Sequence, residues 1–291
     1  MKMFRGVIPA LVTPFKEDFS VDYEGIAKNL DYLEKYVDAV VPCGTTGEAS
    51  TLSYEEHVEV VRFVAETSKL PVIAGSGSNS TREAIWITKE VEKAGAEAAM
   101  LVTPYYNKPN DAGLYEHYRT IAKEVSIPMI VYNIPSRTGI NVSPQLMLKL
   151  SEIDNIVGVK EASGNLKQVS DIIRLIKKKD FSVLSGDDFL TLPILALGGK
   201  GVISVAANIV PHMMKDLYSA FVSGNISKAM EIHHRLSPLF DALFIDTNPI
   251  PVKKAMELMG LSAGKPRLPL VELSEEKTEK LKKVLKELGL L

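Results

Sequence analysis

A lysine near the end of an apolar segment is the residue whose type and position point most directly to chemistry. In the segment Ile156–Glu161, strand alternation places Gly158 and Lys160 on one face and Val157 and Val159 on the other. If the valines face neighbouring helices, Lys160 points into an apolar interior. Burial lowers a lysine's pKa and frees its lone pair, as imine (Schiff-base) chemistry requires. The alternative is a lysine at the strand edge that is paired with a nearby acid.

A tyrosine and an arginine follow another apolar segment. Tyr132 stands at the end of the segment that begins near Pro128, and Arg137 lies in the loop after it. A phenol there can pass a proton if a neighbouring group accepts it, and a guanidinium can bind a substrate carboxylate through two hydrogen bonds. The alternatives are a hydrogen-bonded core tyrosine and a solvated arginine.

Two loops add groups that could bind a substrate. The sequence Gly44-Thr45-Thr46-Gly47-Glu48 combines backbone N–H groups with two hydroxyls, which suits a carboxylate or phosphate oxygen, although a plain turn capped by threonine has the same composition. The loop Thr103–Pro109 contains two prolines and the pair Tyr105 and Tyr106. It is either part of the site or a packing or interface loop.

Other chemistry is disfavoured. The carboxylates of Asp187 and Asp188 could bind a metal, but we expect one of them to cap the following helix, and no zinc-type histidine pattern is present. The glycine-rich stretch 198–201 lacks P-loop spacing and precedes a strand, so it is interpreted as a turn. No Gly-x-Ser-x-Gly motif of a serine hydrolase occurs. We therefore expect neither a metal nor an organic cofactor.

Eight apolar, β-branched segments alternate with helical patterns and must position these groups. Most of them are nearly unbroken runs of apolar residues, which is typical of parallel strands that are buried on both faces. They begin near Gly6, Asp38, Pro71, Ala98, Pro128, Ile156, Ser182 and Gly201. The series predicts an α/β fold, a (β/α)8 TIM barrel over residues 1–224, with the candidate groups on the loops at the carboxyl ends of the strands. An open doubly wound sheet is the competing architecture.

Helix signals support this division. Ser53, Ser80 and Ser143 are expected to cap helices, with Glu83 at capping-box spacing after Ser80. Residues 225–291 have a helical pattern throughout and are predicted to form a C-terminal helical domain that packs on the barrel. Its expected helices are Ile226–Phe244, Pro251–Met259 and Glu275–Leu288.

Composition limits the class of protein. The 291 residues have a formal net charge of −2 and are 46% hydrophobic and 24% charged, as an ordinary globular chain is. No basic stripe suggests nucleic acid as a partner, and no apolar run is long enough to span a membrane. The single cysteine, Cys43, excludes an intrachain disulfide and favours a reducing, cytoplasmic compartment.

Six motifs in order along the chain resemble one family. The motifs are GTTGE, TPYYNKP, YNIPSRTG, KEASGN, LSGDD and GVISVAAN. Together they are similar to the dihydrodipicolinate synthase family, pyruvate-dependent lyases of the class I aldolase type. The similarity extends from about Gly6 to the C-terminus and includes NPIPVK at residues 248–253.

The resemblance implies a role for each matching residue. Lys160 would form the imine with pyruvate, Tyr132 would donate and accept protons, and Thr45 and a neighbouring subunit's Tyr106 would complete a proton relay. Thr46 and the Ile203 backbone would bind pyruvate, while Gly186 would line the pocket. Arg137 would bind the carboxylate of L-aspartate-4-semialdehyde. The product would be 4-hydroxy-tetrahydrodipicolinate, an intermediate of the diaminopimelate route of lysine biosynthesis.

The resemblance also implies an assembly and a possible regulatory site. The family usually forms a homotetramer built from two tight dimers, and its lysine-inhibited members bind lysine at the dimer interface. The positions that match this lysine site are Ala49, Ser50, Tyr54, His57, Asn79, Glu83 and Tyr105. Ala49 and Tyr54 differ from the serine and histidine of some sensitive members, so feedback inhibition stays open.

Other functions remain as alternatives. N-acetylneuraminate lyase and the 2-keto-3-deoxy-sugar acid aldolases share the lysine, the tyrosine and a similar threonine loop, but Ser136-Arg137-Thr138 favours a short acidic aldehyde over a polyol. A non-catalytic binding barrel would be expected to lack one of the four catalytic groups. A phosphate-handling isomerase would need a glycine-rich phosphate site where this chain has Asp187 and Asp188.

Overall fold

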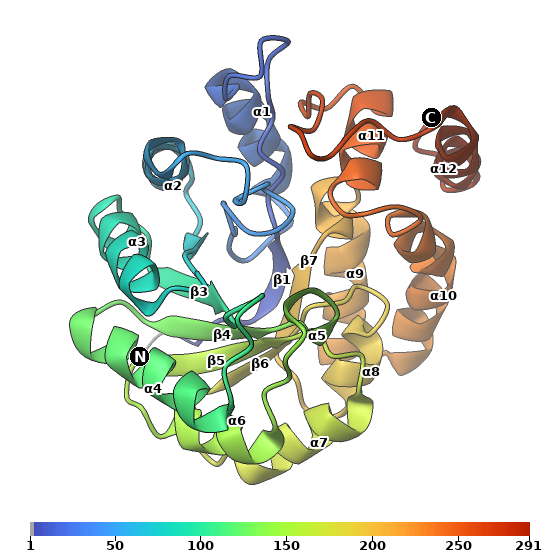
Figure 1. Cartoon of the computed structure of the whole chain (residues 1–291). Coiled ribbons are helices and arrows are strands. Elements are labelled where there is room, and N and C mark those ends of the chain that lie inside the picture. The colour runs from blue at the N-terminus through green and yellow to red at the C-terminus, as the bar shows by residue number, and fades with distance from the viewer. Residues whose placement is uncertain (1–2) are drawn as a thin grey trace.

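The computed structural model of the chain describes residues 3–291 and has a parallel β-sheet surrounded by helices (Figure 1). All paired strands run parallel, and their order in the sheet is β1-β7-β6-β5-β4-β3-β2. The strands are β1 (Gly6–Pro9), β2 (Ile73–Gly75), β3 (Ala98–Val102), β4 (Met129–Asn133), β5 (Ile156–Glu161), β6 (Ser182–Ser185) and β7 (Gly201–Ser204). The parallel α/β architecture that the sequence predicted is confirmed.

The segment 38–42 closes the barrel between the first and last strands of this order. Val41 bridges Ala10, just beyond β1, and Val40 bridges Val72, just before β2, both in parallel. Backbone N–H groups of Asp38 and Val41 donate to β1 carbonyls, while the Val40 and Pro42 carbonyls accept from β2. The segment predicted as the second strand therefore occupies the eighth position of the barrel, although its pairing is limited to isolated bridges.

Helices follow the strands and cover the outside of the barrel (Figure 1). They are α1 (Tyr23–Leu33), α2 (Tyr54–Thr67), α3 (Thr81–Lys93), α4 (Asp111–Glu124), α5 (Pro135–Thr138), α6 (Pro144–Ser151), α7 (Leu166–Leu175), α8 (Thr191–Ala196), the 3-10 turn η1 (Ala206–Asn208) and α9 (Pro211–Val222).

The N-cap residues agree with the sequence-based prediction at three helices and differ from it at a fourth. Ser53, Ser80 and Ser143 accept backbone N–H groups at the starts of α2, α3 and α6. Ser53 forms a full capping box with Glu56, whereas the Glu83 side chain bonds the Ser78 hydroxyl instead of closing a box with Ser80. The predicted aspartate cap of α8 is wrong, because Leu190 occupies that position without a side-chain bond.

The core has two parts that follow strand alternation. Inside the barrel, side chains such as Ile8, Ile130, Leu184 and Ile203 form one buried cluster that also contains Tyr132. Alternate strand residues pack outward against the helices in a second, larger cluster. Val159 packs outward, as the alternation predicted for the face opposite Lys160. The same prediction is wrong for Val157, which belongs to the inner cluster, because the register with β4 shifts by one residue between Met129 and Ile130.

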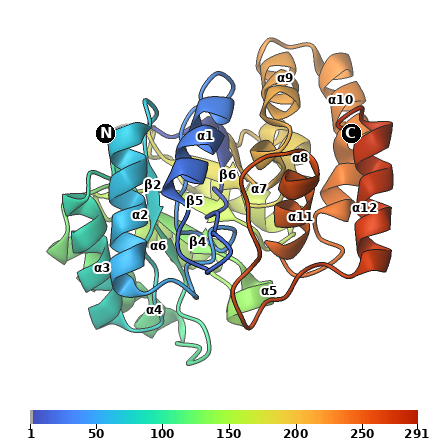
Figure 2. The ribbon, with the colours of Figure 1, turned by 90° about the horizontal axis from the view of Figure 1, so that it is seen from above.

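Three further helices stand near α9 at one side of the barrel (Figure 2). They are α10 (Ile226–Ala242), α11 (Ile250–Leu258) and α12 (Glu275–Glu287), close to the predicted bounds. Buried residues such as Leu236 and Leu285 belong to the same outer cluster as the barrel helices, so the predicted packing is confirmed. The division into two domains at residue 224 stays a prediction. Among the described residues, no helix has the length and apolarity that a membrane crossing requires.

Candidate active site

Lys160 and Tyr132 lie side by side inside the barrel. They are register partners on the adjacent strands β5 and β4, and both side chains are buried. The Lys160 Nζ atom is 4.1 Å from the centroid of the Tyr132 ring. The two residues that the sequence assigned to imine chemistry and proton transfer are therefore neighbours.

The surroundings of Lys160 favour its neutral form. Burial lowers its pKa to about 7, and the positive charge of Arg137 acts in the same direction, whereas Asp188 opposes the shift. A neutral amine is the nucleophile that attacks a carbonyl carbon, and the lowered pKa of Lys160 makes this form accessible near neutral pH. The alternative of a lysine at the strand edge paired with an acid does not fit, because the Lys160 side chain is buried between β4 and β6 and lies over the Tyr132 ring.

Tyr132 is linked to Thr45. Burial raises the pKa of the Tyr132 phenol to about 12, while the charge of Arg137 and a side-chain hydrogen bond to Thr45 lower it. The phenol is consequently protonated at neutral pH and can donate. The hydroxyl of Thr45 supplies the partner that a proton relay needs.

The segment Gly44–Glu48, here called the threonine loop, is a compact turn. The N–H of Gly47 donates to Gly44 and the N–H of Glu48 donates to the Thr45 carbonyl. Thr46 is buried, and its hydroxyl accepts a hydrogen bond of 3.0 Å from the Asn248 side chain. The loop thus presents both threonines in fixed positions at the carboxyl end of segment 38–42.

Three more predicted residues surround the lysine or the cavity. Gly186 lies against Lys160, since a Cβ built on Gly186 would be 3.2 Å from the Lys160 Cγ and Cε atoms. Ile203, on β7, is buried in the cluster that contains Tyr132. Arg137, on the short helix α5, is exposed and donates to the Asn248 carbonyl at 3.2 Å. A side chain at position 186 would therefore crowd Lys160.

Two buried residues of the site were not identified from the sequence. Asp188 accepts from the Ser204 hydroxyl and from the N–H groups of Val205 and Ala206, which anchors the end of β7 beside Ile203. Asn248 connects Thr46 with Arg137. The sequence signal for Asn248 was its place in the NPIPVK motif, whereas Asp188 was one of two aspartates of which either was expected to cap a helix.

A cavity of about 440 Å³ opens beside Thr45 and Tyr132, two of the candidate catalytic residues. Thr45, Tyr132 and Arg137 line it, and the same cavity extends along six of the seven positions that match the lysine site. Those six are Ala49, Ser50, Tyr54, His57, Glu83 and Tyr105. Asn79 is not among the lining residues; its carbonyl accepts from the Asn107 side chain. One continuous space therefore connects the two sets of predicted residues.

Tyr106 is separate from the other catalytic candidates within one chain. It is 90% exposed, has a φ of 69° and does not line the cavity. Its neighbour Tyr105 is 41% exposed at the rim. Within the single chain, Tyr106 thus lies apart from the cavity that Thr45 and Tyr132 line.

Metal ligands do not gather at the site. Across residues 3–291, no group of three or more histidine, cysteine, aspartate or glutamate side chains could hold an ion. The carboxylate of Asp188 is already used in hydrogen bonds to β7.

Known proteins are similar to this chain over nearly its full length. The profile of the dihydrodipicolinate synthetase family matches residues 3–288. A protein of Archaeoglobus fulgidus named 4-hydroxy-tetrahydrodipicolinate synthase is 78% identical over 289 residues, which are 99% of this chain and 100% of that protein. Two solved structures are also similar. The dihydrodipicolinate synthase of Aquifex aeolicus has 49% identity, covers 99% of both chains and has a TM-score of 0.96. The enzyme of Cyanidioschyzon merolae, solved with lysine bound, has 44% identity, 99% coverage of both chains and a TM-score of 0.96.

Proposed function

The chain belongs to the dihydrodipicolinate synthetase family, and we propose that Lys160 is the amine through which it acts on pyruvate. The enzyme is a lyase that condenses pyruvate with L-aspartate-4-semialdehyde to 4-hydroxy-tetrahydrodipicolinate in the diaminopimelate route of lysine biosynthesis. The observation that most supports the role of Lys160 is its burial directly over the Tyr132 ring, where burial lowers its pKa to about 7.

The chemistry follows from a neutral amine beside a proton donor. The Lys160 nitrogen attacks the pyruvate carbonyl carbon and water leaves, which gives the imine. A methyl proton then departs, and the resulting enamine carbon forms a bond to the aldehyde carbon. The amino group of the aldehyde substrate finally attacks the imine carbon, closes the ring and releases Lys160. Tyr132, hydrogen-bonded to Thr45, supplies and accepts the protons of these steps.

Substrate contacts are assigned to four residues around this centre. Thr46 and the Ile203 backbone bind pyruvate, and Gly186 leaves room beside Lys160. Arg137 binds the carboxylate of the aldehyde, which its position on the cavity wall supports. Its fork of N–H donors matches a carboxylate, and one of its nitrogens is already oriented by Asn248.

The proposed assembly is a homotetramer made of two tight dimers. Tyr106 of one subunit would join the relay of Thr45 and Tyr132 in its neighbour, which its 90% exposure in the single chain supports. Sedimentation of the protein over a dilution series, with activity measured in parallel, tests this assignment. Full activity of a monomer would contradict it.

The outer part of the cavity is proposed as a lysine site. Ala49, Ser50, His57, Glu83 and Tyr105 line it, and Asn79 stands in the adjoining loop. Within it, the Glu83 carboxylate would pair with the lysine α-ammonium group. Calorimetry with L-lysine tests binding, and kinetics with added lysine test inhibition separately.

The proposed reaction uses neither a metal nor an organic cofactor, because Lys160 itself supplies the electron-accepting imine. EDTA treatment should leave turnover unchanged. The cytoplasmic location stays a prediction from the single cysteine, Cys43.

Trapping identifies both the amine and the substrate. Incubation with pyruvate and then borohydride should add one reduced pyruvate to Lys160, as peptide mass spectrometry can locate. An unmodified Lys160 would refute its proposed role. Turnover with pyruvate is then compared between L-aspartate-4-semialdehyde and N-acetylmannosamine, and faster use of the sugar would favour the neuraminate lyase alternative.

A further inference from the structure

The last residue of the threonine loop is held by a buried ion pair from the C-terminal part of the chain. The Glu48 carboxylate accepts from the Lys253 ammonium of α11, and both side chains are at most 2% exposed. Its other oxygen accepts the backbone N–H of Arg267 at 2.9 Å. Glu48 thus joins two segments that lie more than two hundred residues further along the chain.

The cations around Glu48 are themselves held by an aromatic ring. The Lys253 Nζ atom is 4.2 Å from the centroid of the Phe15 ring, and the Arg267 guanidinium carbon is 4.3 Å from the same centroid. Both distances are within the range of cation–π attraction. Phe15 and Glu48 therefore provide the compensation that a buried ammonium requires.

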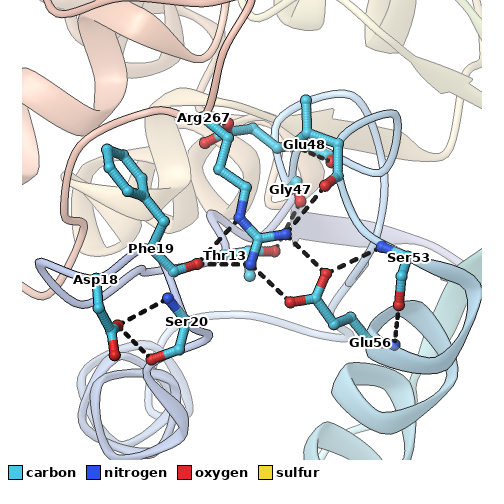
Figure 3. A network of polar contacts seen from close by, with 10 residues as sticks. Thr13, Asp18, Phe19, Ser20, Gly47, Glu48, Ser53, Glu56 and Arg267 are labelled. Carbon is cyan, nitrogen blue, oxygen red and sulfur yellow. Dashed lines mark hydrogen bonds and ion pairs between the residues drawn. The ribbon is translucent and has the colours of Figure 1, made fainter.

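Arg267 extends this connection to the next helix (Figure 3). Its guanidinium binds both carboxylate oxygens of Glu56 on α2 and the carbonyls of Thr51 and Phe19. Glu56 is also the residue that completes the capping box with Ser53. The outer end of the network thus fixes α2, whereas its inner end fixes the threonine loop.

Glu48 is hydrogen-bonded directly to the backbone of Thr45. The Glu48 N–H donates to the Thr45 carbonyl at 3.1 Å, and Glu48 has a left-handed φ of 53°. Such a conformation is unfavourable for a residue with a side chain and needs external support. The same C-terminal region also reaches Thr46, through Asn248. Residues 248–267 therefore hold both threonines in place, Thr45 through Glu48 and Thr46 through Asn248.

We propose that Glu48 is a positioning residue whose ion pair with Lys253 holds Thr45 in line with Tyr132. The inference rests on the proposed function, since it concerns the proton relay assigned there. The C-terminal helices then complete the active site as well as the core, because they supply the partners of Glu48. Loss of the pair would slow proton transfer at the imine without preventing imine formation on Lys160.

The test uses variants of the full-length protein. Glu48→Gln removes the charge and keeps the shape, but it leaves the buried Lys253 ammonium unpaired. The double variant Glu48→Gln with Lys253→Met removes both charges, which preserves stability better than one unpaired ion does. For each variant we would measure thermal unfolding, borohydride trapping of pyruvate, and exchange of the pyruvate methyl protons with D2O. The exchange reports proton removal without the second substrate.

The expected result separates positioning from folding. The double variant should unfold near the wild-type temperature and trap pyruvate on Lys160, but its methyl exchange should be about tenfold slower or more. Glu56→Gln is the matched control, because it breaks an ion pair of the same network at the end away from Thr45. It should lower the unfolding temperature and leave exchange unchanged.

The outcomes also distinguish failure of this inference from failure of the proposed function on which it rests. If the folded double variant exchanges the methyl protons at the wild-type rate, the positioning role of Glu48 is overturned. Trapping of pyruvate on Lys160 at the wild-type level would then still support the proposed function. If the wild-type protein neither traps pyruvate nor exchanges its protons, the proposed function itself fails. If the double variant does not fold, exchange in Glu48→Asp, which keeps the charge on a shorter side chain, decides between the same two results.

Discussion

The Lys160 Nζ atom lies 4.1 Å from the centroid of the Tyr132 ring, and the two residues are register partners on neighbouring strands. A tyrosine ring attracts an ammonium, but burial of the amine outweighs this and lowers the pKa of Lys160 to about 7. The pair therefore combines a nucleophile that is substantially neutral with a phenol that remains protonated. That combination leads to several measurable consequences.

Imine formation should follow the titration of Lys160. The rate at low pyruvate concentration should rise with pH through a midpoint near 7 and reach a plateau above it, as quenched-flow mass spectrometry can measure. Asp188→Asn should move the midpoint to lower pH, because the Asp188 charge raises the pKa of Lys160. A midpoint near the ordinary lysine value of 10.5 would contradict the proposed environment.

Lys160→Met should stabilise the folded protein in a pH-dependent way. The folded pKa of about 7 is below the ordinary value of 10.5, so the unfolded chain binds more protons between these values. In the wild-type protein, the loss of unfolding free energy from burying the charged Lys160 side chain is thus complete below about pH 7 and disappears above about pH 10.5. At pH 6 the variant should gain on the order of a few kcal/mol in unfolding free energy. Denaturant titrations at pH 6 and pH 10 measure the difference, and an equal gain at both would indicate packing alone.

Local patterns predicted most of the barrel and much of the site. The continuous apolar strands and serine caps are short-range signals, so seven of the eight expected segments became regular strands and the helices after Ser53, Ser80 and Ser143 began where expected. Segment 38–42 was predicted as a strand but forms only bridges, because the chain turns at once into the threonine loop. Lys160 and Tyr132 were predictable because the carboxyl ends of barrel strands converge.

Long-range partners could not be predicted in the same way. Asp188 looked like a helix cap, since nothing local shows that its carboxylate accepts from residues 204–206. The pairing of Glu48 with Lys253 joins residues 205 positions apart, and either residue alone resembles an ordinary surface charge. Such contacts depend on how the C-terminal helices pack on the barrel, which periodicity does not specify.

Tyr132→Phe should separate imine formation from proton transfer. The ring and its packing remain, so borohydride should still trap pyruvate on Lys160. Without the phenol, exchange of the pyruvate methyl protons should fall by roughly a hundredfold or more. Thr45→Val should give a smaller loss, because it removes only the hydrogen bond to the phenol. Exchange by Tyr132→Phe at the wild-type rate would exclude Tyr132 as the proton carrier.

Arg137→Ala should damage the aldehyde step more than the pyruvate step. Arg137 lies on the cavity wall, and loss of a charge-assisted hydrogen bond to the aldehyde carboxylate should raise the KM for L-aspartate-4-semialdehyde by about tenfold to a hundredfold. Its charge also lowers the pKa of Lys160, so trapping should be compared at pH 9, where the amine is neutral in both proteins. Arg174→Ala, an exposed arginine on α7 that does not line the cavity, is the matched control and should leave both steps unchanged. Equal losses in pyruvate trapping and aldehyde KM for Arg137→Ala would show that the residue supports the whole site instead of binding the second substrate.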